Sequence, residues 1–157
     1  MPGHVLLALA FVSLTACSTP SVSTADYALM PQSMAGALLK QCSRGVPHAS
    51  NAWTPSRDQL SDLESHLPQL SELAARQRLP QSIGDPKASF RQYVGIVVDH
   101  HRYIYINAIA ASDVTSPHAP DPHVTPMIVC DGGSAFWGAL YDPESKTFSQ
   151  LDANGAI

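Results

Sequence analysis

Residues Phe90–Val98 read FRQYVGIVV, and residues Tyr103–Ala110 read YIYINAIA. Both runs are rich in β-branched and aromatic side chains, which favour strands. The polar residues 99–102 (DHHR) between them predict a hairpin turn. Because both runs are apolar at successive positions, the predicted sheet has two apolar faces. We expect residues 111–126 and the N-terminal segment to cover part of the second face; otherwise that face is a partner surface.

Three shorter runs downstream also have strand character. They are Met127–Cys130, Ala135–Tyr141 and Thr147–Leu151. The segments between them, DGGS at 131–134 and DPESK at 142–146, contain the residues that favour turns. Short loops join antiparallel neighbours, so the sequence predicts four or five antiparallel strands.

An amphipathic helix is predicted before the strands, because apolar residues recur there at helical spacing. These residues are Leu60, Leu63, Leu67, Leu70 and Ala74. The helix begins either with Thr54 as N-cap and Pro55 in the first turn, or with Ser56 as N-cap. Ser56 and Gln59 match a capping box. Pro68 predicts a kink or a break, so the expected fold is α+β, with one kinked amphipathic helix packed on a four- to five-stranded antiparallel sheet.

The N-terminus has the features of an export signal. Residues Val5–Leu14 read VLLALAFVSL. As a helix, ten residues rise about 15 Å, which is half of a bilayer core, so this is the apolar region of a signal peptide. The following residues 14–17 (LTAC) resemble the bacterial lipobox, in which the thiol of the cysteine, here Cys17, receives the lipid.

This resemblance implies three parts of the chain. Residues 1–16 are the signal peptide, residues 17–32 a flexible tether, and residues 33–157 a single α+β domain. Cys17 would anchor the protein in a lipid bilayer, since two or more acyl chains hold a protein stably. Because Ser18 follows the cysteine, the resemblance to other lipoproteins implies an outer-membrane location, with the domain facing the periplasm or exposed at the cell surface.

The chain has three cysteines. If Cys17 carries lipid, Cys42 and Cys130 remain, and in an oxidising compartment they are expected to form a disulfide. The alternative is a cysteine–histidine nucleophile or metal pair, although neither cysteine has a cysteine or histidine within four positions. The net charge of −4 includes no cluster of Lys and Arg, so no nucleic-acid partner is predicted. No motif indicates a cofactor.

The C-terminal part resembles a pattern in small uncharacterised proteobacterial secreted and lipoprotein families. The resemblance covers residues 53–155 and implies a fold and a location, not an activity. The matching segments are Val129–Gly133 (VCDGG), Phe136–Gly138 (FWG), Tyr141-Asp142, Phe148 and Asn154-Gly155, with Arg91–Gly95 and Tyr105–Ala108 upstream.

Polar candidates for chemistry are few. Adjacent His100 and His101 would point to opposite faces of a strand, or into solvent in a turn. His118, Asp121 and His123 lie in a proline-rich loop and could bind zinc or copper weakly, but an exposed polar loop is the favoured interpretation. No catalytic or metal residues are therefore predicted.

The aromatic residues of the strands are the leading candidates for binding. Tyr103, Tyr105, Trp137 and Tyr141 could form an exposed patch of the kind found at protein-binding hot spots; the alternative is core packing. Strand alternation places Phe136 on one face and Trp137 and Tyr141 on the other.

The sequence thus predicts a non-enzymatic binding module in the cell envelope, such as an inhibitor or immunity-type partner of a secreted or periplasmic enzyme. Two alternatives remain open: a structural or assembly lipoprotein of the outer membrane, and a small hydrolase or metal-binding protein.

Overall fold

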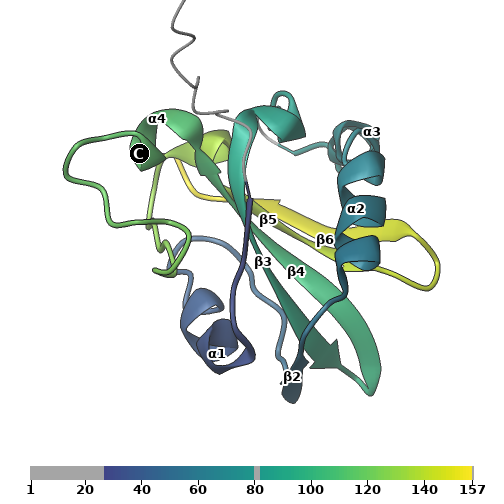
Figure 1. Ribbon diagram of the computed structural model, residues 1–157. Coiled ribbons are helices and arrows are strands. Elements are labelled where there is room, and N and C mark those ends of the chain that lie inside the picture. Colours follow the sequence, from purple (N-terminus) through teal and green to yellow (C-terminus); the bar gives the residue numbers. More distant parts are fainter. Residues whose placement is uncertain (1–26, 80–81, 157) are drawn as a thin grey trace, which may run out of the picture.

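The computed structural model describes residues 27–79 and 82–156. The predicted signal peptide, Cys17 and the first part of the predicted tether lie outside these residues. The described chain is α+β, as predicted, with helices on both sides of one sheet (Figure 1). Residues 27–32, assigned to the tether from the sequence, belong to this fold, since Tyr27–Leu29 form strand β1.

The sheet is mixed, which corrects the prediction of a purely antiparallel one. Its order is β1-β3-β4-β5-β6, and β2 also pairs with β3. β1 runs parallel to β3, while the other neighbours are antiparallel. The long connection between β1 and β3 permits a parallel pairing. The remaining strands are β2 (Asn51–Trp53), β3 (Ser89–Val98), β4 (His101–Ala110), β5 (Trp137–Asp142) and β6 (Thr147–Ala153).

The central hairpin of β3 and β4 confirms the strongest strand prediction. Its turn is shorter than expected, because β4 already begins at His101. Asp99 and His100 have φ angles of 49° and 66°. Two central residues with positive φ form the turn whose twist matches that of the flanking strands.

Two helices, rather than one kinked helix, precede the hairpin. They are α2 (Arg57–His66) and α3 (Gln69–Gln77). Ser56 caps α2 and forms the predicted capping box with Gln59. Pro68 has no N–H and would clash with the preceding turn, so the first helix ends before it. The short helices are η1 (Gln32–Met34), α1 (Ala35–Leu38), η2 (Pro86–Ala88), α4 (Ala111–Val114) and η3 (Gly133–Ala135).

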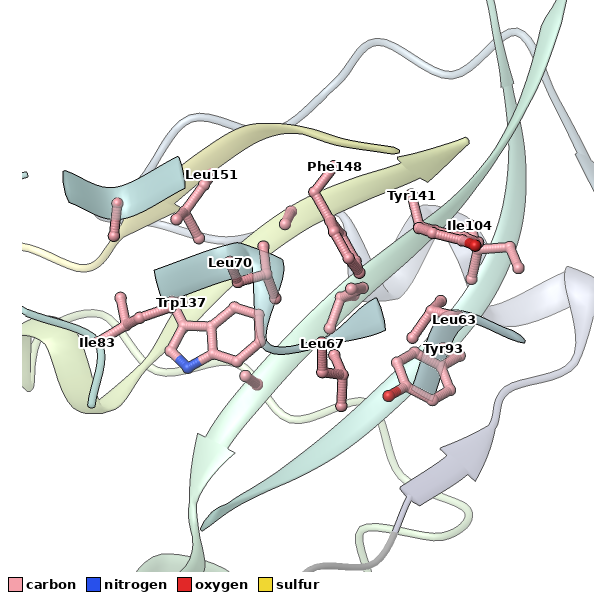
Figure 2. Close-up of a cluster of buried hydrophobic side chains, with 14 of the residues drawn as sticks. Leu63, Leu67, Leu70, Ile83, Tyr93, Ile104, Trp137, Tyr141, Phe148 and Leu151 are labelled. Carbon is pink, nitrogen blue, oxygen red and sulfur yellow. The ribbon is translucent and has the colours of Figure 1, made fainter. Parts of the chain in front are cut away.

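The helices α2 and α3 cover one face of the sheet. Their predicted leucine stripe is buried there, together with Trp137 and Tyr141 of β5 (Figure 2). The opposite face is covered by the N-terminal segment, α1 and the chain around Met127. Phe136 lies in this second cluster, so the predicted alternation of Phe136 and Trp137 is confirmed. The sheet is therefore buried on both faces, as its apolar strands require.

Carboxylates of α2 bind polar groups at the sheet. Glu64 accepts hydrogen bonds from Arg91 and from the hydroxyl of Tyr93. Asp62 accepts one from the hydroxyl of Tyr141 and one from Lys146 Nζ at 2.8 Å. These bonds join α2 to β3 and to the β5–β6 hairpin. The hydrogen bond from Lys146, and to a smaller extent the one from Tyr141, hold the pKa of Asp62 below its ordinary value.

This lowered pKa predicts an acid-dependent loss of stability. A carboxylate whose pKa is lower in the folded state stabilises that state above its unfolded pKa, near 3.8, and this stabilisation is lost as the pH falls through the folded pKa. Asp62→Asn should therefore destabilise the protein near neutral pH. The difference from wild type should shrink as the pH falls from about 5 to about 2. Urea denaturation across this range measures the effect, and a difference independent of pH would contradict it.

Candidate interaction surface

An irregular segment lies across the second face of the sheet. We name residues 122–131 the strap. The sequence predicts a strand at Met127–Cys130, but these residues form none. The strap instead crosses the strands, and side chains from β3, from β4 and from the end of β6 hydrogen-bond to its backbone. A segment that pairs with no strand needs such partners for its buried N–H and C=O groups.

Gln92 of β3 holds the first half of the strap. Its side-chain nitrogen donates hydrogen bonds to the carbonyl oxygens of Pro122, at 2.6 Å, and Thr125, at 2.7 Å. Its side-chain oxygen accepts one from the N–H of Met127 at 2.9 Å. Gln92 is fully buried, so these bonds satisfy an amide that would otherwise be costly to bury.

Asn107 and Asn154 hold the rest of the strap. Asn107 Nδ2 donates to the carbonyl oxygen of Met127 at 2.9 Å and to Gln92 Oε1 at 3.0 Å. Asn154 Nδ2 donates to the carbonyl oxygens of Val129, at 2.6 Å, and Asp131, at 3.0 Å. Three buried amides thus bind the strap along its length.

The guanidinium of Arg44 joins this network. It donates to Asn154 Oδ1 at 2.7 Å, to Tyr105 Oη at 3.3 Å and to Asn107 Oδ1. Arg44 is only 8% exposed, and its Nε lies buried without a hydrogen-bond partner. An alanine Cβ at position 138 would lie 3.0 Å from that nitrogen, so Gly138 makes room for the guanidinium.

The disulfide between Cys42 and Cys130 is confirmed. It spans 88 residues, with 5.0 Å between the Cα atoms, and joins the strap to the segment that carries Arg44. Both cysteines are exposed. Closing a loop of this length stabilises the folded state by about 4.6 kcal/mol in the chain-entropy description.

The outer side of the strap carries two large apolar side chains. Its buried residues include Pro122 and Met127, and Met127 packs in the core of this face. Val124 and Ile128 point outward and are 60% and 44% exposed. The strap therefore presents two large apolar side chains on a backbone that the sheet holds in place.

The predicted aromatic patch does not lie on the surface. Trp137 and Tyr141 are 0% exposed beneath α2 and α3, and Tyr105 is 2% exposed on the other face beside Arg44. Burial raises the pKa of Tyr105 and of Tyr141. Tyr103 alone of the four is partly exposed, and its ring lies 4.7 Å from that of His101. These residues are separated by the sheet and cannot form one binding surface.

The histidines do not assemble a metal site in the part of the chain that the structure describes, where no cluster of three or more ligating side chains occurs. His101 Nε2 lies 3.1 Å from Asp142. Desolvation raises the pKa of Asp142, but hydrogen bonds from the backbone N–H groups of Glu144 and Ser145, from the Ser145 hydroxyl and from His101 outweigh it, and the pKa is lowered. His123 packs edge-on against the ring of Phe90.

A shallow hollow of about 210 Å³ lies beside the C-terminal segment. Its lining includes Ser43, Asp152 and Asn154. Asp152 already accepts hydrogen bonds from the N–H groups of Gly45 and Ala153, and Asn154 binds the strap. Asp152 and Asn154 therefore already have hydrogen-bond partners within the fold.

No protein-family model matches the chain, and neither a curated protein nor a solved structure matches it. The interaction surface is therefore inferred from the geometry of the chain alone.

Sequence reasoning missed the residues that hold the strap. Gln92 and Asn107 stand within apolar runs, at positions that a fully buried strand would fill with apolar side chains. A polar amide in such a run signals a buried backbone that needs partners. Arg44 and Asn154 stand in loops, where nothing in their surroundings distinguishes them from solvated residues.

Replacing Asn107 tests the network. Asn107→Leu removes the donor to Met127 and the acceptor for Arg44, so buried polar groups lose their partners. The free energy of unfolding should fall by about 3 kcal/mol. The matched control is Asn51→Leu at an exposed position of β2, where a change within about 0.5 kcal/mol is expected. Equal effects of the two substitutions in urea denaturation would contradict a stabilising role for Asn107.

Adding one methyl group at Gly138 tests the packing around Arg44. Its Cβ would lie 2.9 Å from Tyr105 Oη and 3.1 Å from the carbonyl oxygen of Ile106. Gly138→Ala should therefore lower the free energy of unfolding by about 1–3 kcal/mol. In Gly36→Ala the new Cβ meets nothing within 4 Å, and a helical glycine replaced by alanine should gain up to about 1 kcal/mol. Thermal melting of both variants distinguishes overpacking from a general effect of the methyl group.

Proposed function

We propose that this protein is a cell-envelope lipoprotein, anchored in the outer membrane through lipidated Cys17, whose domain faces the periplasm and binds another macromolecule. The observation that supports it is the use of the three cysteines. Cys17 ends a lipobox-like sequence, and the other two pair with each other. A disulfide in a small domain is typical of an oxidising compartment outside the cytoplasm.

The anchor accounts for membrane attachment without a spanning segment. Among the described residues, no helix has the length and apolarity needed to cross a bilayer. Two or three acyl chains at Cys17 would hold the protein stably. The tether would then be the segment between Cys17 and β1, which begins ten residues further along the chain at Tyr27.

An inhibitor or immunity-type role is the concrete form of the binding hypothesis, with a secreted or periplasmic enzyme as partner. The domain is small and its irregular strap is fixed by amides and a disulfide, so a surface built on it loses little entropy on binding. Cys130 is oxidised in the disulfide, so it has no thiolate for the hydrolase alternative. The aromatic residues of the strands are not part of the proposed surface, because three of the four are buried.

Lipidation is tested first. Cys17→Ser should abolish the mass increase expected for a diacylglyceryl group and an N-acyl chain, and should release the protein from the membrane fraction. The matched control is the double variant Cys42→Ser, Cys130→Ser, which loses the disulfide but should keep the lipid and stay with the membranes. Mass spectrometry of the intact protein and envelope fractionation measure both. A wild-type chain that carries no lipid on Cys17 would contradict the proposed anchor.

Partner binding is tested on the lipidated full chain by cross-linking in envelopes and exposure to secreted extracts. A captured enzyme that loses activity on addition of one equivalent of the protein would support the inhibitor role. Capture of a membrane assembly without inhibition would favour the structural alternative. Failure to capture any protein at micromolar concentration would contradict the binding hypothesis.

A further inference from the structure

The disulfide between Cys42 and Cys130 lies at the surface of the domain. Both cysteine residues are exposed, although they close a loop that spans 88 residues. A disulfide breaks when a thiolate attacks one of its sulfur atoms, so exposure meets the first requirement for this reaction. Whether the reaction also unfolds the domain depends on what else holds the two segments that the disulfide joins.

Asn154 holds the same two segments without using the disulfide. Its Nδ2 donates hydrogen bonds to the carbonyl oxygens of the two residues that flank Cys130, at 2.6 and 3.0 Å. Its Oδ1 accepts a hydrogen bond at 2.7 Å from Arg44, which stands two residues after Cys42. Asn154 is only 5% exposed, so water competes little for these bonds. One buried side chain thus connects both sides of the disulfide.

Further hydrogen bonds fix the segment that carries Cys42. Gln41 Nε2 donates to the carbonyl oxygen of Met127, in the strap, at 3.3 Å. Ser43 Oγ accepts a hydrogen bond from the N–H of Gly155 at 3.3 Å. Both sequence neighbours of Cys42 are therefore held by contacts that reduction of the disulfide does not remove.

We propose that the disulfide between Cys42 and Cys130 is a thiol–disulfide exchange site, which a dithiol reduces while the domain stays folded. One thiolate of the dithiol attacks either sulfur atom and forms a mixed disulfide, and the other cysteine leaves as a thiolate that takes up a proton. The second thiol of the dithiol loses its proton and attacks the mixed disulfide, so the remaining cysteine also leaves and is protonated. The protein gains two electrons and two protons, which the dithiol loses as it closes into its own disulfide.

The chemistry indicates the class of partner and what the exchange changes. A dithiol fits as the reductant because its second thiol resolves the mixed disulfide within the same complex. Reduction removes the covalent tie between the strap and the segment of Arg44, while the hydrogen bonds of Asn154 and Gln41 remain. The redox state of the two cysteines then sets how firmly the strap is held. The inference goes beyond the proposed function and does not depend on the lipid anchor.

The first experiment measures how the rate of reduction depends on urea. The full chain is incubated with dithiothreitol at urea concentrations below the unfolding transition, and free thiols are alkylated at intervals. Mass analysis of peptides reports on Cys42 and Cys130 separately from Cys17. Exchange in the folded state predicts a rate that is proportional to the dithiothreitol concentration and changes less than about twofold with urea. A rate that rises exponentially with urea, with the slope of equilibrium unfolding, would overturn the proposal.

The second experiment tests the role of Asn154 by hydrogen exchange. The amide of Gly133 donates to the carbonyl oxygen of Gly155 at 3.1 Å, next to the strap, and reports on its opening. Reduction should speed exchange of this amide about threefold or less in the wild type, but about tenfold or more in Asn154→Leu. Asn51→Leu, at an exposed position of β2, is the matched control and should behave as the wild type. Equal increases in the wild type and Asn154→Leu would contradict the role of Asn154.

The outcomes separate this inference from the proposed function. A chain without lipid on Cys17, measured by mass, overturns the anchor and leaves the exchange site in place. Reduction that follows global unfolding overturns the exchange site and leaves the anchor in place. Replacing dithiothreitol by oxidised glutathione should restore the disulfide between Cys42 and Cys130, and a folded chain that stays reduced would overturn the exchange. The urea measurement on the wild type decides the inference if Asn154→Leu does not fold.

Discussion

A sheet that is apolar on both faces is the constraint on which the rest of this structure depends. Strands β3, β4 and β5 carry buried side chains on either side, but only α2 and α3 are long enough to cover a face as helices. The other face is covered mainly by irregular chain, whose backbone groups lack the internal partners of a helix. The buried amides Gln92, Asn107 and Asn154 supply those partners. The polar network is therefore a consequence of covering one face of the sheet with irregular chain instead of helices.

The two faces are stabilised by different chemistry. On the helical face, carboxylates of α2 reach over the edge of an apolar core to Arg91, Tyr93 and Tyr141, and Lys146 binds Asp62. Glu64 and Asp62 are partly exposed, so water shares the solvation of these carboxylates, while their partners Arg91, Tyr93 and Tyr141 are buried. On the strap face, Arg44 is buried among neutral acceptors. Its guanidinium donates hydrogen bonds to Tyr105, Asn107 and Asn154. Removing any one of these leaves a buried donor unpaired, which makes this face sensitive to substitution.

The sequence predicted the elements with long, regular patterns and missed those made by tertiary contacts. The hairpin of β3 and β4, the leucine stripe and the capping box at Ser56 follow from local periodicity and were correct. The parallel strand β1 has three residues, too few to show a period, so the sequence does not distinguish it from tether. Met127–Cys130 has strand composition because alternate side chains point into the core, yet it pairs with no strand. The disulfide was predictable because cysteine chemistry left one pairing; the amide network was not, since its members come from four distant segments.

The burial of the aromatic residues also changes how the surface should be understood. Tyrosine and tryptophan at strand positions are enriched both in cores and at interfaces, so composition alone cannot separate the two. In this chain Trp137, Tyr141 and Tyr105 fill the two cores. The exposed large apolar side chains are instead Tyr27 and, in the strap, Val124 and Ile128. Val124 and Ile128 are exposed because the strap backbone on either side of them is bound to the sheet by hydrogen bonds from Gln92, Asn107 and Asn154. The hydrogen bonds that complete the core beneath the strap thus also fix the direction of its two outward apolar side chains.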